Sequence, residues 1–355
     1  MTSFYQKITF VQIEHSTICN AACPQCTREL KPGDYSWFEQ TYIPTEFYET
    51  RIPQYAYDNL KSINFCGALG DPCAAPNFLD VLRIVKRKNP KATIGVATNG
   101  GMKSPKWWAE LATILNNNDH VIFGIDGLED TNGIYRINVR WNNLINNLKA
   151  FIDAGGNAHW QFISFAHNEH QIKEAETFAY SLGVKKFFTL YNNRFVTEKL
   201  MGVSSVGSNG EKLMPPTQEQ EKHELLCQPT PQVSDHQEWL EVAEKGCITC
   251  EAKDRNEAYI DVNTHLLPCC YIAGAVFTRE PGQGSYDGFY DLYNQHGGDQ
   301  IKLSKHDWDD VIASGFYKAI EDSWTQKFGQ GRLFVCSAIC AKTDARINFY
   351  ANVKD

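Results

Sequence analysis

Hydrophobic and polar positions along the first 195 residues follow a pattern of short strands separated by helices. Six short apolar segments, rich in β-branched and aromatic residues, are predicted to be strands: Thr9–Glu14, Ser62–Cys66, Thr93–Thr98, His120–Ile125, Trp160–Ser164 and Lys186–Thr189. Between them, apolar side chains recur at the spacing of an amphipathic helix. The alternation predicts right-handed βαβ units around a parallel sheet, either open and doubly wound or closed into an incomplete barrel.

The predicted helices have apolar stripes and clear ends. Four stripes repeat at intervals of three and four residues, and they begin at Phe78, Trp108, Leu144 and Ile172. Pro105 suits the first turn of the second helix, because proline lacks the N–H that this turn leaves unpaired. Gly155 and Gly183 suit the ends of the third and fourth helices. We therefore expect one face of each helix to pack against the sheet.

After residue 195 the alternation stops. Val203–Gln232 is polar and rich in Ser, Gly, Pro and Gln, which predicts a linker or a long loop. Farther on, Ala258–Val262 and Leu266–Cys270 predict a hairpin around a polar turn. One apolar face of a final helix is formed by Phe316, Ile320, Trp324 and Phe328. We predict one domain over residues 1–195, a linker over 196–245 and a small α+β domain over 246–355.

Composition and charge exclude several classes of protein. With 355 residues, 43% of them hydrophobic, the chain has enough apolar material for one large or two ordinary domains and is not disordered. A net charge of −8 argues against nucleic-acid binding. No apolar run approaches the ~20 residues that span a bilayer, and the first residues do not form a secretion signal. We expect a cytoplasmic protein without a membrane segment.

The 12 cysteines are too many to explain as disulfides in a reducing compartment. Most of them fall into tight groups: Cys19, Cys23 and Cys26; Cys247, Cys250, Cys269 and Cys270; and Cys336 and Cys340. Thiolates at such short spacings are typical of metal sites. The first group is a C-x3-C-x2-C loop after the first strand. Three thiolates can hold three irons of a [4Fe–4S] cluster and leave the fourth iron open, whereas structural zinc usually takes four ligands in two pairs.

This loop resembles the hallmark of the radical S-adenosylmethionine (SAM) enzymes. The resemblance implies a partial (β/α)6 TIM-type barrel whose open iron is chelated by SAM. It further implies a flavodoxin- or ferredoxin-type reductant, and cleavage of SAM to a 5′-deoxyadenosyl radical that abstracts hydrogen from a substrate. Many members have an aromatic residue just before the third cysteine, where this chain has Gln25.

Three further segments, each after a predicted strand, are similar to family motifs. Gly67–Pro72 resembles a G-x-G-E-P segment with Asp for Glu, which implies cofactor contacts at Gly70, Asp71 and Pro72. Thr98 and Asn99 begin a T-N-G segment of the same kind. Outside the family, either segment would be an ordinary turn.

The third segment, at residues 124–136, resembles an S-x-D-G…R element, with Gly124 in place of the serine. The resemblance assigns Asp126 and Arg136 to the cofactor site, where Arg136 would pair with the methionine carboxylate. The alternative for Arg136 is a solvated surface charge.

The C-terminal cysteines resemble the twitch domain, a short form of the SPASM domain that follows some radical SAM barrels. The resemblance implies one auxiliary [4Fe–4S] cluster, because the longer cysteine run of a full SPASM domain is absent. Its expected ligands are Cys250, Cys269, Cys336 and Cys340, with Cys247 in reserve. A structural zinc held by the same thiols is the rival. We expect Cys66, Cys73 and Cys270 to pack as small apolar residues, although Cys66 and Cys73 flank Gly70–Pro72, where a catalytic thiol is possible.

The expected function is that of an oxidoreductase or modifying enzyme. Its substrate would be a peptide or protein, or else a small molecule that is oxidised. No catalytic side chain can be named, because hydrogen abstraction needs no particular residue and the substrate pocket would be built from loops such as Lys31–Thr45. The alternative is a non-catalytic binding protein stabilised by zinc or by an iron–sulfur cluster.

Overall fold

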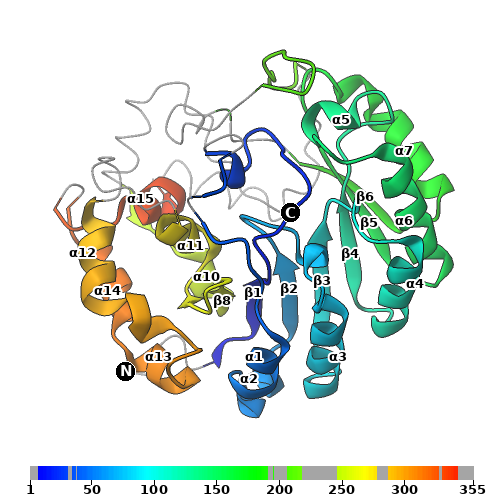
Figure 1. The fold of residues 1–355 in the computed structure, drawn as a ribbon. Helices are drawn as coiled ribbons and strands as arrows, with labels where there is room; N and C mark the ends of the chain where they lie inside the picture. The colour runs from blue at the N-terminus through cyan, green and yellow to red at the C-terminus, as the bar shows by residue number, and fades with distance from the viewer. Residues whose placement is uncertain are drawn as a thin grey trace, which may run out of the picture. The chain divides into compact units, whose positions relative to one another are not determined.

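The computed structural model describes residues 7–30, 34–36, 38–190, 195, 206–217, 246–277, 287–327 and 330–342 (Figure 1). The chain divides into two compact units. The barrel unit comprises Ile13–Glu49 and Lys61–Pro229, and the C-terminal unit comprises Met1–Gln12, Thr50–Leu60 and Thr230–Asp355. Most of the predicted linker, residues 196–245, lies outside the described residues, so the predicted domain boundaries stay a prediction.

The barrel unit contains five adjacent parallel strands in the order β6-β5-β4-β3-β2. Their bounds are Ser62–Cys66 for β2, Thr93–Thr98 for β3, His120–Gly124 for β4, Ala158–Ile163 for β5 and Lys186–Leu190 for β6. The last residues of β1 (Phe10–Glu14) also belong to this unit. All six strands lie within two residues of their predicted bounds.

Helices connect the strands and pack on one side of the sheet (Figure 1). The four long ones are α3 (Phe78–Lys88), α4 (Pro105–Ile114), α6 (Trp141–Asp153) and α7 (Ile172–Ser181). Shorter elements are η2 (Thr27–Leu30), α1 (Thr45–Thr50), η3 (Pro72–Ala74), α5 (Asn132–Tyr135) and η4 (Glu169–Gln171). The start of α4 is as predicted, with Pro105 in its first turn and the Ser104 hydroxyl accepting from the Trp107 N–H.

Aromatic side chains form the core between the sheet and these helices. The ring of Phe123 on β4 lies 5.1 Å from that of Trp108 on α4 and 5.8 Å from that of Phe151 on α6. On β5, Trp160 contacts Phe178 of α7 edge-on at 6.3 Å. Burying each such ring contributes up to about 3 kcal/mol. The opposite side of each strand therefore carries the residues that are free to build a site.

The C-terminal unit has two small antiparallel pairs. β8 (Glu257–Ile260) pairs with β9 (Leu266–Leu267), and β7 (Cys247–Ile248) pairs with β10 (Ala341–Lys342). Its helices are α2 (Gln54–Asn59), α10 (Glu251–Asp254), α11 (Cys270–Phe277), α12 (Asp287–His296), α13 (Trp308–Ala313), α14 (Phe316–Ser323) and α15 (Phe334–Cys340), with η5 at Gly298–Ile301. No helix in the described ranges is long and apolar enough to cross a membrane.

The predicted hairpin is present but shorter than expected. Its second strand ends at Leu267, and the chain enters helix α11 at Cys270 instead of continuing as a strand. In the turn, Thr264 rather than Asn263 takes the left-handed conformation, with φ of 67°. The Thr264 hydroxyl donates to Ser304 at 2.8 Å, which helps to hold a conformation that non-glycine residues disfavour. The predicted final helix also ends early: α14 stops at Ser323, and Phe328 lies outside the described residues.

Candidate active site

The first cysteine group lies on a loop that follows β1 in the barrel unit. Cys23 is buried, and Cys19 and Cys26 are half-buried. The loop is tight: the Cys26 N–H donates to the Cys23 carbonyl at 3.1 Å, and the Ala21 N–H donates to the Cys19 thiol at 3.4 Å. Gln25 adopts a left-handed φ of 63° and is itself buried. This turn gathers the three thiols on one short loop, as the spacing predicts.

Burial and mutual repulsion disfavour ionisation of these thiols. Burial and the neighbouring Cys26 together raise the pKa of Cys23 to about 11, although Arg136 partly offsets the effect. Burial, Asp71 and the other two thiols raise the pKa of Cys19 even more. Three thiolates in this position therefore need a positive centre beside them. In the described ranges, no three Cys, His, Asp or Glu side chains are placed so that they could hold a single metal ion together. A [4Fe–4S] cluster takes each thiolate on a separate iron, and the loop's donor set fits it.

The segment after β2 packs directly against this loop. The Ala68 and Leu69 N–H groups donate to Glu14 Oε1 at 2.8 and 2.6 Å, which fixes the turn beside the end of β1. A Cβ on Gly70 would lie 2.2 Å from the Ser16 carbonyl oxygen, so only glycine permits this approach. The Ala68 carbonyl oxygen in turn lies 3.9 Å from the Cys26 thiol. The segment Gly67–Pro72, which resembles the G-x-G-E-P motif, thus lies next to Cys26.

The carboxylate of Asp71 joins this segment to the segment after β3. Its Oδ1 accepts from the Cys73 N–H at 2.9 Å, and its Oδ2 accepts from the Thr98 hydroxyl at 2.9 Å and the Asn99 N–H at 2.8 Å. Burial raises the pKa of Asp71, and these hydrogen bonds lower it in part. The Asp71 side chain is therefore occupied by hydrogen bonds within the protein.

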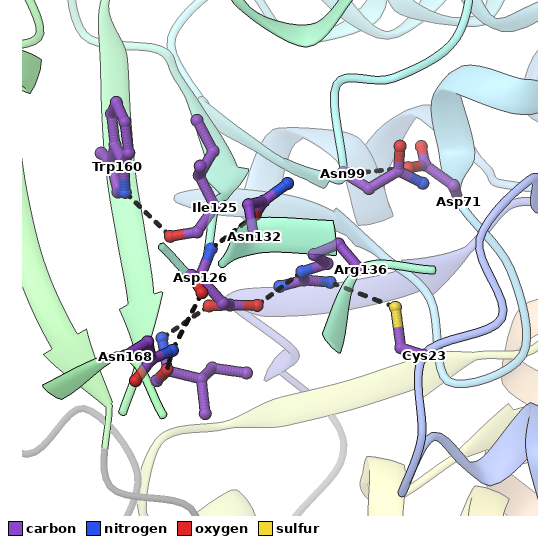
Figure 2. Close-up of polar contacts among 10 residues, drawn as sticks. Cys23, Asp71, Asn99, Ile125, Asp126, Asn132, Arg136, Trp160 and Asn168 are labelled. Atoms are coloured by element: carbon purple, nitrogen blue, oxygen red, sulfur yellow. Dashed lines mark hydrogen bonds and ion pairs between the residues drawn. The ribbon is translucent and has the colours of Figure 1, made fainter. Parts of the chain in front are cut away.

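Asn99 reaches from the end of β3 to the cysteine loop. Its Nδ2 donates to the Asn20 side-chain oxygen at 2.9 Å and to the Cys19 thiol at 3.5 Å, and its Oδ1 accepts from the Gly101 N–H at 2.8 Å. Figure 2 shows Asn99 beside Asp71, on the same side of the site as the cysteine loop. The T-N-G segment that begins at Thr98 thus lies next to Cys19.

Arg136 connects the segment after β4 to the second cysteine. Its Nε donates to Asp126 Oδ2 at 2.6 Å, and its guanidinium lies 3.9 Å from the Cys23 thiol (Figure 2). Only 15% of the Arg136 side chain and none of the Asp126 side chain is exposed, so Arg136 is not the solvated surface charge of the alternative. A Cβ on Gly124 would already lie 2.4 Å from this guanidinium. The arginine therefore occupies the space that a side chain at position 124 would take.

Residues that the sequence analysis missed hold Asp126 in place. Asp126 Oδ1 accepts from the Ile163 N–H at 2.6 Å, its own N–H donates to Asn132 Oδ1 at 2.9 Å, and its carbonyl accepts from Asn168 Nδ2 at 2.9 Å (Figure 2). Both asparagines are buried polar side chains. The sequence signal for them is weak: each is an asparagine within a few residues of a strand end.

Arg28 is a further residue that the sequence analysis missed. It lies two residues beyond Cys26 and is buried. Its guanidinium donates to the Thr17 carbonyl at 2.5 Å and to the Leu69 carbonyl at 3.0 Å. These bonds tie the cysteine loop to the segment after β2, so Arg28 is a positioning residue of the site.

Comparison with known proteins agrees with this arrangement. A model of the radical SAM superfamily matches residues 13–179. Residues 13–179 form a radical SAM domain. The prediction of a radical SAM enzyme is confirmed at this level, with its reaction unspecified, and the family implies one [4Fe–4S] cluster and SAM. A curated relative from Pyrococcus furiosus, a tungsten-containing aldehyde ferredoxin oxidoreductase cofactor-modifying protein, is 30% identical over 124 residues. That match covers 34% of this chain and only 31% of the relative.

Solved structures show the same fold at low sequence identity. Streptococcus suis SuiB bound to S-adenosylmethionine superposes with a TM-score of 0.51 at 17% identity, over 94% of this chain and 73% of SuiB. Native anSMEcpe with bound AdoMet gives a TM-score of 0.50 at 13% identity, over 98% of this chain and all of the other. These similarities confirm the α/β class and decide for the partial radical SAM barrel over the doubly wound sheet.

The second cysteine group lies in the C-terminal unit. Cys250 precedes α10, Cys269 precedes α11, and Cys336 and Cys340 lie one turn apart on α15. Burial raises the pKa of Cys269 most, and Cys270, Cys336 and Cys250 raise it further; Cys250 also raises the pKa of Cys336. The Cys340 carbonyl accepts from the Thr249 N–H at 3.0 Å, next to Cys250. Cys247 is exposed.

An N–H donor, Trp324, and two cations, Arg332 and Lys253, lie near this second set of thiols. Burial raises the pKa of Cys336 to about 12, and the Trp324 indole N–H and Arg332 partly offset the effect. The ammonium of Lys253 lies over the ring of Trp324, 5.6 Å from the ring centre, as a cation–π contact. An N–H donor and a cation beside a thiol favour its thiolate form, as a ligand to a metal or cluster requires.

Proposed function

We propose that this chain binds SAM at a [4Fe–4S] cluster held by Cys19, Cys23 and Cys26, and uses it to abstract hydrogen from a substrate. One observation carries the proposal: each of the three cysteines is contacted by a different strand-end segment. Asn99 contacts Cys19, Arg136 contacts Cys23, and the Ala68 carbonyl contacts Cys26. Once reduced, the cluster would supply the electron that cleaves SAM to a 5′-deoxyadenosyl radical.

The chain's own residues would orient the cofactor around this centre. Gly70, Asp71 and Pro72 present backbone atoms beside the cluster loop, and Thr98 and Asn99 hold that backbone through Asp71. Arg136 has its Nε bound to Asp126 and its Nη1 next to Cys23, so Nη2 would be the nitrogen that binds the methionine carboxylate. A flavodoxin- or ferredoxin-type protein would deliver the electron.

Iron analysis tests the first cluster. After anaerobic reconstitution, we expect the wild-type chain to bind iron with broad brown absorption, and Cys26→Ala to lose about four irons. Cys66→Ala removes a thiol outside the loop and is the matched control, with unchanged iron. Zinc without iron in the wild type, or equal iron in Cys26→Ala, would contradict the proposal and favour the non-catalytic metal protein.

The proposal extends to the C-terminal unit. Residues 246–355 would form a twitch-like domain with one auxiliary [4Fe–4S] cluster, held by Cys250, Cys269, Cys336 and Cys340, and joined to the barrel by residues 196–245. The support is the nearness of Cys250 and Cys336 to Cys269, whose pKa both raise, and the position of Cys340 one helical turn from Cys336. We expect about eight irons in the wild type and about four in Cys250→Ala. An unchanged count in Cys250→Ala, or zinc in its place, would contradict the auxiliary cluster. Cys247→Ala should keep about eight irons if Cys247 is only the reserve ligand, and should lose about four if Cys247 holds the cluster.

Modification of a peptide or protein is the substrate class that we favour, and oxidation of a small molecule is the second. The support is that a structure of SuiB with its precursor peptide SuiA has the same fold, with a TM-score of 0.50 at 16% identity. A deuterium-labelled substrate would transfer its label to 5′-deoxyadenosine, which mass spectrometry detects. A candidate whose label never appears there is not the hydrogen donor.

A further inference from the structure

One face of the parallel sheet carries polar side chains that the SAM site does not use. In every strand from β2 to β5, residues facing the helices are buried, and the alternate residues on the opposite face are mostly half-buried. Strand register places the side chains of this inner face next to one another. We call its polar members the inner wall: Asn64, His120, His159, Gln161 and Lys186.

The inner wall faces the same side as the SAM site. His120, Ile122 and Gly124 share one face of β4, and the Arg136 guanidinium lies where a side chain on Gly124 would point. Gln161 is the register partner of Gly124, and His159 lies two residues earlier on β5. Because two residues of a strand span about 7 Å, a short molecule anchored at His159 reaches the level of Arg136.

The two histidines and Lys186 form a compact group at the far end of the inner wall. The imidazole rings of His120 and His159 stack with centroids 4.7 Å apart and an interplanar angle of 17°. Lys186 is the register partner of His159. Burial and the nearby Lys186 lower the pKa of both histidines, that of His159 to about 4, while Asp119 partly offsets the shift at His120. Both rings are neutral at pH 7, and each can donate one N–H.

The inner-wall side chains make few polar contacts with the described residues. Across the part of the chain that the structure describes, the side chains of His120, His159, Gln161 and Lys186 make no hydrogen bond or ion pair, and the buried Asn64 Oδ1 has no donor. Asn64, His120, His159 and Gln161 are half-buried, and half-buried polar groups without partners indicate a place for water or a ligand. Lys186 is exposed at the start of β6, with its ammonium 5.7 Å from the centre of the Phe188 ring.

Charge indicates which ligand fits. The inner-face residues of β2–β6 include no Asp or Glu, and Lys186 is their one cation. Asp119, next to His120, is turned away and bound to Lys86 at 2.5 Å. A single ammonium with two neutral N–H donors matches the single negative charge of a carboxylate.

We propose that the inner wall is the substrate site and that it binds a carboxylate-bearing substrate, with the carboxylate at Lys186, His159 and His120 and the rest of the molecule extending past Gln161 toward Arg136. The inference rests on the proposed function for the identity of the reacting end. The carboxylate belongs either to a free small acid or to an acidic side chain of a peptide.

Titration of the reconstituted, SAM-bound protein with defined probes tests the site. Histidine labelled with ¹³C is followed by NMR during addition of glutarate or of the peptide acetyl-Gly-Glu-Gly-amide. Glutaramide and acetyl-Gly-Gln-Gly-amide are the uncharged controls. We expect saturable shifts of the His120 and His159 signals with at least one carboxylate probe and not with its amide. Which of the two probes binds distinguishes a small acid from a peptide.

Matched variants identify the anchor. We expect Lys186→Gln to weaken carboxylate binding about tenfold or more, since it removes a charge-assisted hydrogen bond. Lys185→Gln, which removes the neighbouring lysine and leaves Lys186, should bind as the wild type does; both lysines are exposed. No shift with either carboxylate, equal binding of acid and amide, or wild-type affinity in Lys186→Gln would each overturn the proposal. This readout needs no SAM cleavage, so its failure is distinguishable from failure of the proposed function.

Discussion

The guanidinium of Arg136 fills the space that a side chain on Gly124 would occupy, 2.4 Å from the position of the missing Cβ. Arg136 cannot move away without breaking its hydrogen bond to the fully buried Asp126. The glycine at position 124 and the arginine twelve residues later therefore depend on each other. Glycine replaces the serine of the resembling motif at position 124, and the guanidinium of Arg136 takes up the space. The replacement therefore does not weaken the assignment of Asp126 and Arg136 to one site.

Restoring the family's serine should harm this site. In Gly124→Ser, the new side chain displaces Arg136 from Cys23 or strains the sheet, and overpacking of this kind costs about 1–3 kcal/mol of unfolding free energy. We also expect SAM affinity, measured by calorimetry, to fall about tenfold. Gly133→Ala is the control, because a Cβ there meets nothing within 4 Å. Wild-type stability and SAM affinity in Gly124→Ser would show that Arg136 is not fixed as described.

Asp71 should act as a structural tie and not as a charge for the cofactor. In Asp71→Asn, an amide N–H faces a donor, either Cys73 N–H or the pair from Thr98 and Asn99. An unsatisfied buried group of this kind costs about 1–3 kcal/mol in urea unfolding. The exposed Asp58→Asn is the control and should change stability little. Equal stability of both variants would contradict the role assigned to Asp71.

Acid should destabilise the barrel unit through His15. This histidine is buried between Tyr48 and Asn77, and burial lowers its pKa from 6.5 to about 4. A lowered pKa means that the unfolded chain binds the proton first, so this stability is present above pH 6.5 and is lost as the pH falls toward 4. Between pH 7 and 5 the loss from this residue is about 2 kcal/mol.

Urea unfolding at the two pH values measures this effect. His15→Gln should reduce the pH dependence by that amount, whereas His306→Gln, at an exposed position, should leave it unchanged. The same pH dependence in His15→Gln and the wild type would rule out His15 as its source.

The sequence predicts most of the barrel unit because its signals are local. The six strands are short β-branched or aromatic runs, and the turns at Gly70 and Asn99 follow directly from strand ends. Contacts between distant residues are different. Glu14 binds the N–H of Leu69, and Arg28 binds the carbonyl of that residue, across 55 and 41 positions of sequence, so no local pattern reveals them.

The C-terminal unit was harder to predict for the same reason. Cys269 and Cys270 follow a strand-like apolar run, yet the chain enters helix α11 at Cys270. In the turn, the left-handed conformation falls on Thr264, whose hydroxyl finds Ser304 forty residues away. Tertiary contacts determine both the start of α11 and the conformation of Thr264, and such contacts cannot be predicted from the spacing of apolar residues.

Formation of 5′-deoxyadenosine tests the central claim most directly. The reconstituted chain is incubated anaerobically with SAM and dithionite, and the product is measured by mass spectrometry for the wild type, Cys26→Ala and Cys66→Ala. The account predicts 5′-deoxyadenosine from the wild type and from Cys66→Ala, and none above background from Cys26→Ala. Equal product from Cys26→Ala and the wild type would contradict the claim that the Cys19, Cys23 and Cys26 loop is the source of the radical.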